Sequence, residues 1–206
     1  MQIVKTSLAG GKVIFESILD EIPGGVSLDV TRLDNLTLNA NVDKRFLPAG
    51  TPVYVNLTSR VAEVCKSAIA TGGTTSAIQV PKNHHFKVGD FLNDGTTSSA
   101  ISTIDETNAG YSILNTAEGL TYSVNTKYGQ GTVSGTSKVL AYTPNGMTKD
   151  TIWLGDGNAD VAVVTMGTVR EDALTFPVNA LYKAALRGFD SSGAAIAAAR
   201  SLITLV

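Results

Sequence analysis

The sequence contains few of the residues from which catalytic and metal sites are built: 1 cysteine and 2 histidines stand among 206 residues. The single cysteine excludes a disulfide within the chain, so the fold does not depend on an oxidising compartment. No apolar run approaches the roughly 18 residues that a membrane span needs. Residues 1–15 also lack the continuous apolar region of a signal peptide. We therefore expect a soluble protein without a membrane partner.

An excess of positive charge is also missing. The formal net charge is -2 at pH 7, so no overall positive field gathers nucleic acid or an anionic membrane. With 43% hydrophobic and 17% charged residues, the chain has the composition of a globular protein of one or two domains. Nucleic acid is not an expected partner.

Glycine is abundant while aromatic residues are scarce: the chain has 20 glycines, and only 6% of its residues are aromatic. Together with many threonines and serines, this composition predicts short strands joined by tight turns. Alternating apolar residues at Val53 and Val55, then at Val61 and Val64, predict a hairpin that bends at residues 58–60. The expected fold class is mainly β with one or two short helices.

Two segments rich in Gly, Thr and Ser, at residues 71–76 and 135–137, interrupt this pattern. Such composition is typical of linkers. Between them, dense turn signals predict a small β-barrel or sandwich. The simplest organisation is a module of residues 73–137 inserted into a parent β-module of residues 1–72 and 138–206. A linear two-domain chain is the alternative.

Residues 161–189 join an apolar strand, a polar bend and a short helix. We expect the strand to be buried on both faces and to end at Gly167. A helix is predicted at residues 178–187, with Pro177 in its first turn and Gly188 as its C-terminal cap. At the end of the chain, residues 194–200 suit about two helical turns, and residues 201–206 read as a closing strand.

Cys65 is the obvious candidate nucleophile, with His84 or His85 as its base. Its apolar, strand-like surroundings favour simple core packing instead. The two histidines are adjacent, so on an extended strand they point to opposite faces and cannot easily chelate one ion.

Residues 156–160 have the acidic spacing that opens a calcium loop, but Gly167 stands where the twelfth position needs glutamate. Two interpretations of residues 156–160 remain, a loop that binds an ion and an ordinary β-turn. The glycines at 72–73 and 129–131 lack the lysine or helix of a phosphate loop. No serine lies in a G-x-S-x-G setting and the carboxylates are scattered, so we expect neither an enzyme nor a cofactor.

Three segments resemble the capsid decoration proteins of tailed bacteriophages: residues 49–68, 138–152 and above all 161–188. In that family a strand with a G-x-V pattern and a polar bend precedes a short alanine-rich helix. Residues 78–114 look like a module of phage head fiber proteins. Its signature is spelled here by Lys82, His84, Phe86, Lys87, Val88, Gly89, Asp90 and Phe91. The resemblance extends from about residue 36 to the C-terminus, and residues 1–35 have no match.

This resemblance implies a non-enzymatic virion structural protein, a capsid decoration or head fiber base protein. Such a protein is made in the host cytoplasm and sits on the capsid surface, bound to the major capsid protein, as a homotrimer. Residues 73–137 are expected to project outward and to meet a host-surface glycan or a fiber protein.

Residues 1–35 could form a capsid-binding arm, because their apolar, strand-forming side chains could extend a capsid sheet. The candidate contact residues are Ile3, Val4, Val13, Ile14, Phe15 and Ile18. Strands of the protein's own core would have the same pattern, and both interpretations stand.

Two further classes of function are open. A carbohydrate-binding or adhesin module fits the β-rich composition, with sugar-stacking aromatic side chains at Trp153, Tyr122, Tyr128 and Tyr142. A cysteine hydrolase rests on Cys65 and the histidines alone.

Overall fold

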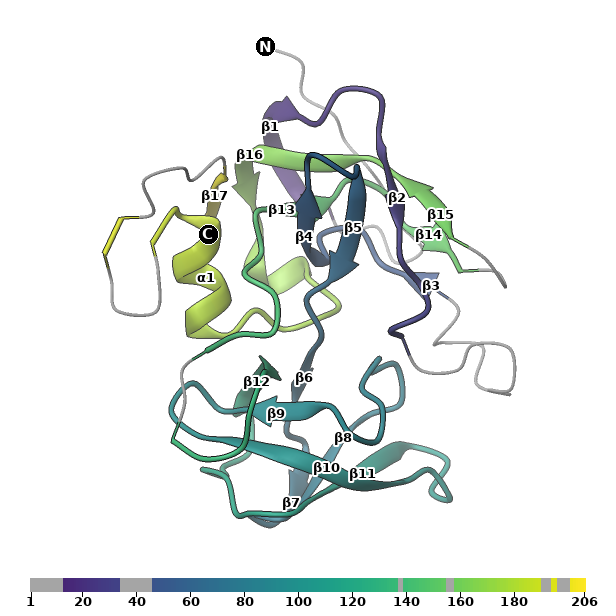
Figure 1. The fold of residues 1–206 in the computed structure, drawn as a ribbon, viewed down its shortest axis with the longest axis vertical. Helices are drawn as coiled ribbons and strands as arrows, with labels where there is room; N and C mark the ends of the chain where they lie inside the picture. Colours follow the sequence, from purple (N-terminus) through teal and green to yellow (C-terminus); the bar gives the residue numbers. More distant parts are fainter. Residues whose placement is uncertain (1–12, 34–45, 137–138, 155–157, 190–193, 196–200) are drawn as a thin grey trace.

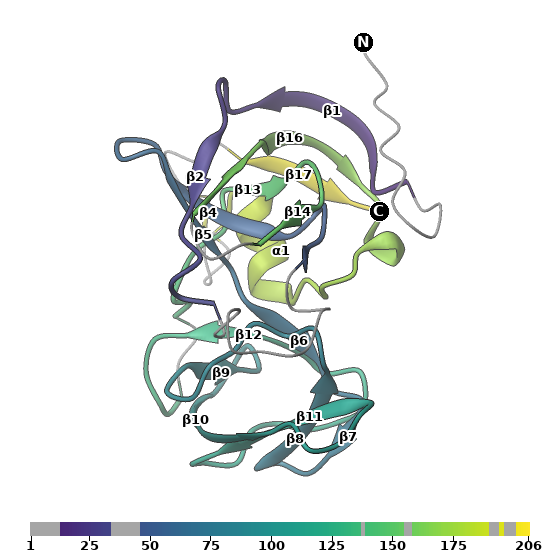
Figure 2. The same ribbon diagram turned by 90° about the vertical axis from the view of Figure 1, so that its right-hand side faces the viewer.

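The structure, a computed structural model, describes residues 13–33, 46–136, 139–154, 158–189, 194–195 and 201–206. These residues form strands β1 to β17, the 3-10 helix η2 and the α-helix α1. The predicted mainly-β fold with short helices is confirmed. Figures 1 and 2 show two curled sheets stacked along the long axis of the molecule.

The larger sheet combines strands from both ends of the chain. Its order is β1-β16-β13-β4-β5-β2-β15, and β17 adds to β16. The β2–β5 and β16–β17 pairs are parallel and the others are antiparallel. The strands are β1 (Phe15–Glu21), β2 (Val26–Leu28), β4 (Pro52–Asn56), β5 (Val61–Val64), β13 (Gly146–Thr148), β15 (Ala159–Val161), β16 (Val163–Val169) and β17 (Leu202–Leu205).

The hairpin of β4 and β5 confirms the prediction from sequence. Val53 pairs with Val64 and Val55 with Ala62. The Asn56 side chain accepts hydrogen bonds from the backbone of Thr58 (3.0 Å) and Ser59 (3.2 Å). A side chain that satisfies the backbone in this way stabilises the bend.

Strand β16 is buried at five of its seven positions, as its apolar sequence predicts. The expectation that Gly167 ends this strand is wrong. Gly167 continues the ladder, opposite Ile18 of β1 and Ile203 of β17. A Cβ atom there would come within 2.3 Å of the Ser17 carbonyl oxygen, so glycine permits the close approach of β1.

Helix α1 (Ala180–Leu186) follows η2 (Glu171–Ala173). Asn179 is its N-cap, and its side chain accepts from the Tyr182 backbone. Pro177 therefore precedes the cap instead of standing in the first turn. The C-terminal cap is as predicted: Gly188 has φ of +83° and, with Phe189, returns hydrogen bonds to the last turn. The closing strand is also confirmed, whereas residues 196–200 lie outside the described residues.

The smaller sheet has the order β6-β12-β9-β10-β11-β8-β7. It begins before residue 73 and its last strand ends at Gly131. At residues 139–142 the chain forms no strand, and Leu140 makes only an isolated bridge to Gly131. The strands are β6 (Ser67–Ile69), β7 (Gly72–Gly73), β8 (Ala77–Pro81), β9 (Phe91–Asn93), β10 (Ser98–Asp105), β11 (Tyr111–Thr116) and β12 (Lys127–Gly131).

We call residues 67–131 the second module and the other described residues the first module, which also contains the short pair β3 (Phe46–Leu47) and β14 (Ile152–Trp153). Two apolar clusters fill the first module and a separate one fills the second, around Phe86, Leu114 and Tyr128. In Figures 1 and 2, β1, β16 and β17 lie at the end of the long axis away from the second module.

Candidate functional site

The candidate capsid-contact residues fall into three environments. Ile3 and Val4 lie outside the described residues. Val13 and Ile18 are partly buried, whereas Ile14 and Phe15 are buried among the core side chains of the first module. Side chains packed in this way are not available to a partner in this structure, so their burial favours the interpretation that they are part of the protein's own core.

Other apolar side chains of β1 and β17 are exposed. Leu19 on β1 has 62% of its surface exposed, and Leu202 on β17 has 54%. Both strands pair with β16 at the end of the molecule away from the second module (Figure 2). This end therefore offers a β surface with apolar side chains to a partner.

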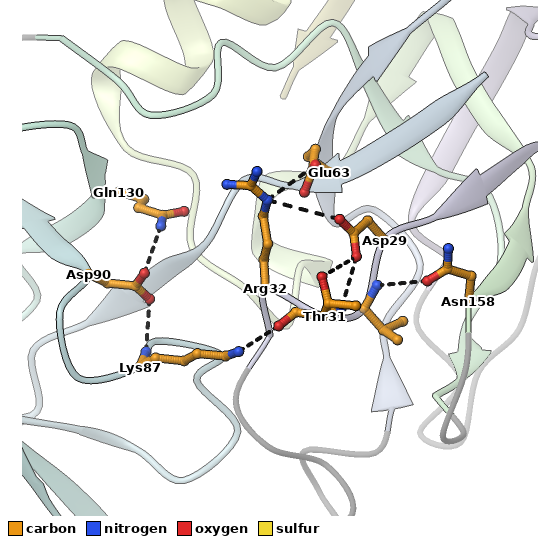
Figure 3. A network of polar contacts seen from close by, with 9 residues as sticks. Asp29, Thr31, Arg32, Glu63, Lys87, Asp90, Gln130 and Asn158 are labelled. Atoms are coloured by element: carbon orange, nitrogen blue, oxygen red, sulfur yellow. Dashed lines mark hydrogen bonds and ion pairs between the residues drawn. The ribbon is translucent and has the colours of Figure 1, made fainter. Parts of the chain in front are cut away.

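A polar network joins the two modules (Figure 3). Asp90 accepts from the Lys66 ammonium at 2.6 Å, the Gln130 amide at 3.0 Å and the Lys87 backbone at 2.8 Å. The Lys87 ammonium reaches across to the Thr31 carbonyl oxygen at 2.6 Å. Because the Lys66 side chain is only 2% exposed, removing Asp90 would leave a buried charge, a change that typically costs about 3–5 kcal/mol.

Arg32 extends this network within the first module. Its Nε lies 3.4 Å from the Glu63 carboxylate and 3.9 Å from the Asp29 carboxylate, and its guanidinium lies over the Tyr142 ring. Hydrogen bonds from Thr31 lower the pKa of Asp29, while burial raises the pKa of Glu63 and of Tyr142. The Arg32 side chain is mostly exposed, so these ion pairs orient the loop more than they stabilise the fold.

Tyr182 of α1 makes a second, buried contact between the two modules. Its hydroxyl donates to the Lys66 carbonyl at 2.9 Å and accepts from the Gln130 backbone N–H at 3.0 Å. Burial raises the pKa of Tyr182 well above its ordinary value, so the hydroxyl stays protonated. Gly129 allows the contact, because a Cβ there would lie within 3.2 Å of the ring and hydroxyl. The helix thus holds β12 of the second module in place.

Glu171 adds an ion pair on each side. The ammonium groups of Lys127 (2.6 Å) and Lys183 (2.5 Å) contact its two carboxylate oxygens. Burial by itself would raise the pKa of Glu171, but the hydrogen bonds from the two lysines hold it below its ordinary value. Lys127 belongs to β12 and Lys183 to α1, so this contact also ties the second module to the first.

An open crevice of about 600 Å³ lies between the two modules. Phe46, Pro48 and Thr175 line it from the first module, and Pro81, Lys82, Asn83, Ala109 and Gly110 line it from the second. Trp153 packs edge-on against Phe46, with ring centroids 4.5 Å apart. The Lys82 ammonium donates to the Glu106 carbonyl at 2.6 Å. The crevice is therefore lined by one aromatic side chain, Phe46, and by polar side chains from both modules.

Sequence reasoning found Trp153 but missed Phe46, Asn83 and Thr175. Phe46 begins strand β3, whereas Asn83 and Thr175 lie in loops of the second and the first module. No spacing in the sequence connects these three residues. A weak signal existed in the Pro48 and Pro81 turns, which mark the loop ends that border the crevice.

The other aromatic candidates differ in accessibility. Tyr128 is buried, donates to the Thr121 carbonyl at 2.8 Å, and has its pKa raised to about 12 by burial. A sugar cannot stack on it. Tyr142 is partly buried and stacks against Tyr54, and Tyr122 packs against the second core. Of the four, Trp153 is the best exposed.

Cys65 is buried, and its thiol points to the Tyr142 carbonyl oxygen at 3.7 Å. Burial raises the pKa of this thiol well above its ordinary value, which disfavours the thiolate that nucleophilic chemistry needs. Cys65 and His85 line one narrow crevice without space for a water molecule. His85 packs edge-on against Phe176, and His84 lies 3.8 Å from the Glu106 carboxylate. The two histidines therefore have different neighbours, although they lie between β8 and β9 and not on a strand as expected.

The predicted acidic loop at residues 156–160 lies partly outside the described residues. Of its polar groups, the Asn158 side chain accepts from the Val30 backbone at 3.4 Å. In the described part of the chain, no three His, Cys, Asp or Glu side chains gather as metal ligands. The glycines at 72–73 and 129–131 lie in strands β7 and β12.

None of the helices in the described ranges has the length and hydropathy that crossing a bilayer requires. In comparisons with known proteins, no protein-family model, no curated protein and no solved structure matches this chain.

Proposed function

We propose that the protein is a structural protein of a tailed-bacteriophage virion, a capsid decoration or head fiber base protein without enzymatic activity. It binds the outer surface of the head through the first module and presents the second module outward. Its partners are the major capsid protein and further copies of this chain. The resemblance of residues 49–68, 138–152 and 161–188 to decoration proteins motivates this proposal.

One observation carries the proposal furthest: the two ends of the molecule are different. The chain leaves the larger sheet after β5, forms the smaller sheet, and rejoins the larger one at β13. Strands β1 and β17, which carry the exposed Leu19 and Leu202, lie at the opposite end. A protein that binds a lattice at one end and projects a module from the other needs such a division.

Binding of this kind stabilises a capsid by mass action, because a ligand that binds only the assembled lattice lowers the free energy of that state. At a free concentration about 100 times the Kd, each occupied site adds about 2.7 kcal/mol. No cofactor or reactive group takes part.

The test is reassembly. Purified protein is added to heads that lack it, and saturable co-sedimentation and the temperature at which the heads release DNA are measured. We expect binding to raise that temperature. Leu19→Asp and Leu202→Asp should reduce binding, whereas Val124→Asp, which alters a similarly exposed side chain of the second module, should not. Failure of the wild-type protein to co-sediment would contradict the proposal.

The homotrimer is tested separately by the solution mass of the full chain. A trimer at micromolar concentration supports a preformed spike. A monomer would count against it, although copies could still meet on the lattice.

A further inference from the structure

We propose that the crevice between the two modules binds neutral pyranose sugars, with Phe46, which packs against Trp153, as its aromatic side and Asn83 and Thr175 as its polar groups. This site is independent of capsid binding, because it lies on the side of the molecule where β3 meets the second module. It would give the virion surface an affinity for glycans.

The first argument is the exposure of the aromatic pair. Phe46 is 39% exposed and Trp153 is 51% exposed, although both are large apolar side chains that a fold normally covers. Their rings meet at 77°, in an edge-to-face arrangement, so one ring buttresses the other. A rigid, exposed aromatic surface beside a crevice is suited to the C–H face of a sugar ring.

The second argument is the chemistry of the remaining wall. The Asn83 carboxamide and the Thr175 hydroxyl can both donate and accept hydrogen bonds, as sugar hydroxyl groups require. Among the described residues that line the crevice, Lys82 is the only charged one, and its ammonium donates to the Glu106 carbonyl. The Asn83 and Thr175 side chains are the uncharged hydrogen-bonding groups that a neutral sugar would use.

The third argument is size and construction. A volume of about 600 Å³ lies in the range of small-ligand sites, roughly 300–1,000 Å³, and would hold one or two sugar rings. The crevice is bordered by both modules, whose relative position is fixed by the Tyr182 and Asp90 contacts. Its walls are therefore preorganised, which reduces the entropic cost of binding.

The sequence supplies a direct probe, because Trp153 is the only tryptophan of the chain. The full-length protein is applied to an array of neutral hexose and N-acetylhexosamine oligosaccharides, and the sugars that bind are titrated while Trp153 emission is followed. We expect a saturable change in emission. An acidic oligosaccharide of the same length is the comparison ligand, and tighter binding of the acidic sugar than of any neutral one would contradict the proposal.

Three variants locate the site. Phe46→Ala, Asn83→Ala and Thr175→Val should each weaken binding by about five- to tenfold, as the loss of one packing or hydrogen-bonding partner does. Phe189→Ala is the matched control, since Phe189 is exposed to a similar extent, 43%, but does not line the crevice. Thr175→Val is nearly isosteric, so it separates a lost contact from a folding defect.

The outcomes are distinct. Binding that falls in the three site variants and persists in Phe189→Ala supports the proposal. An array without any bound neutral sugar overturns it, and so does a bound sugar whose affinity is unchanged in Asn83→Ala and Thr175→Val. Because the isolated chain is used, neither result depends on whether the protein binds capsids.

Discussion

The two modules reach a β-sheet by opposite routes. In the second module, β9, β10 and β11 are consecutive in the chain and pair as neighbours; β12 and β8 flank them, and β6 and β7 are the edge strands. In the first module, β1 pairs with β16 although about 150 residues separate them, and β17 comes from the end of the chain. Local pairing costs less loop-closure entropy than pairing across the whole chain.

This difference explains how one module can be inserted into the chain of the other. The second module has its own apolar cluster and its own turns, in which Asp94 and Asp105 accept hydrogen bonds from neighbouring backbone groups. It can therefore form before the first module is complete. The first module needs both ends of the chain, and we expect its stability to depend on the junction contacts that hold those ends in register.

The largest expected effect follows from a cavity beside the long-range β1–β16 pair. Phe15, the first residue of β1, is 1% exposed and packs in the core of the first module. Phe15→Ala should therefore lower the free energy of unfolding by about 3–5 kcal/mol. Amide hydrogen exchange should show protection lost in the first module and retained in β9, β10 and β11.

The matched control is Leu19→Ala on the same strand, because Leu19 is exposed and its loss should change stability little. Equal loss of protection in both modules for Phe15→Ala would contradict their separate construction.

Much of this construction could be predicted from the sequence, and the reason is locality. The β4–β5 hairpin follows from alternation around Asn56, and the cap at Gly188 follows from the end of an apolar helical pattern. The partner of β1 could not be predicted, because alternation in β1 says nothing about a strand 150 residues away. The prediction that Gly167 ends a strand was wrong for the same reason. Glycine is needed there because the Ser17 backbone of β1 approaches closely, and the sequence does not reveal that contact.

The candidate crevice was predictable only in part. Trp153 was one of four aromatic residues that the sequence offered as sugar-stacking groups, whereas Asn83 and Thr175 are ordinary loop residues until the fold brings them to one crevice. Tyr128 was wrongly included among the sugar-stacking candidates, because the sequence did not show that it is buried. Its burial follows from the packing of β12 against the second core, which no short segment of sequence encodes.

A smaller effect should come from cutting the contact between the modules. Tyr182→Phe removes the hydroxyl that bonds Lys66 and Gln130 and leaves two buried backbone groups without that partner, a loss of about 1–3 kcal/mol. We expect the two modules to unfold at more widely separated denaturant concentrations, measured by circular dichroism and by Trp153 emission together.

Tyr128→Phe is the matched change within one module, since the Tyr128 hydroxyl bonds Thr121 of the same module. It should destabilise the second module by about 1 kcal/mol without separating the transitions further. If both tyrosine variants separated the two transitions equally, Tyr182 would not be a coupling contact.

The turns of the second module predict a dependence on pH. Burial by itself would raise the pKa of Asp94, but hydrogen bonds from Thr96, Thr97 and Thr121 lower it below its ordinary value. A carboxylate with a lowered pKa stabilises the fold above about pH 4, its unfolded value, and that contribution disappears as pH falls through the folded pKa.

Asp94→Asn should therefore be less stable than the wild-type protein by about 1 kcal/mol at pH 7, and the difference should shrink as pH is lowered below about 4. Urea unfolding at a series of pH values measures this difference. A gap that stays constant down to pH 2 would show that the Asp94 charge does not contribute.

The smallest expected effect concerns a single lysine that crosses the junction. The Lys87 ammonium donates to the Thr31 carbonyl of the first module at 2.6 Å, whereas the Lys149 ammonium pairs with Glu21 within the first module at 2.7 Å. Both contacts are near the surface, so Lys87→Met and Lys149→Met should each cost only about 0.5 kcal/mol.

The two variants should differ in how they affect the junction, because only Lys87→Met removes a contact between the modules. Hydrogen exchange at residues 29–33 should accelerate in Lys87→Met and stay unchanged in Lys149→Met. Equal rates in both variants would mean that Lys87 does not couple the modules, and that the Tyr182, Asp90 and Glu171 contacts do.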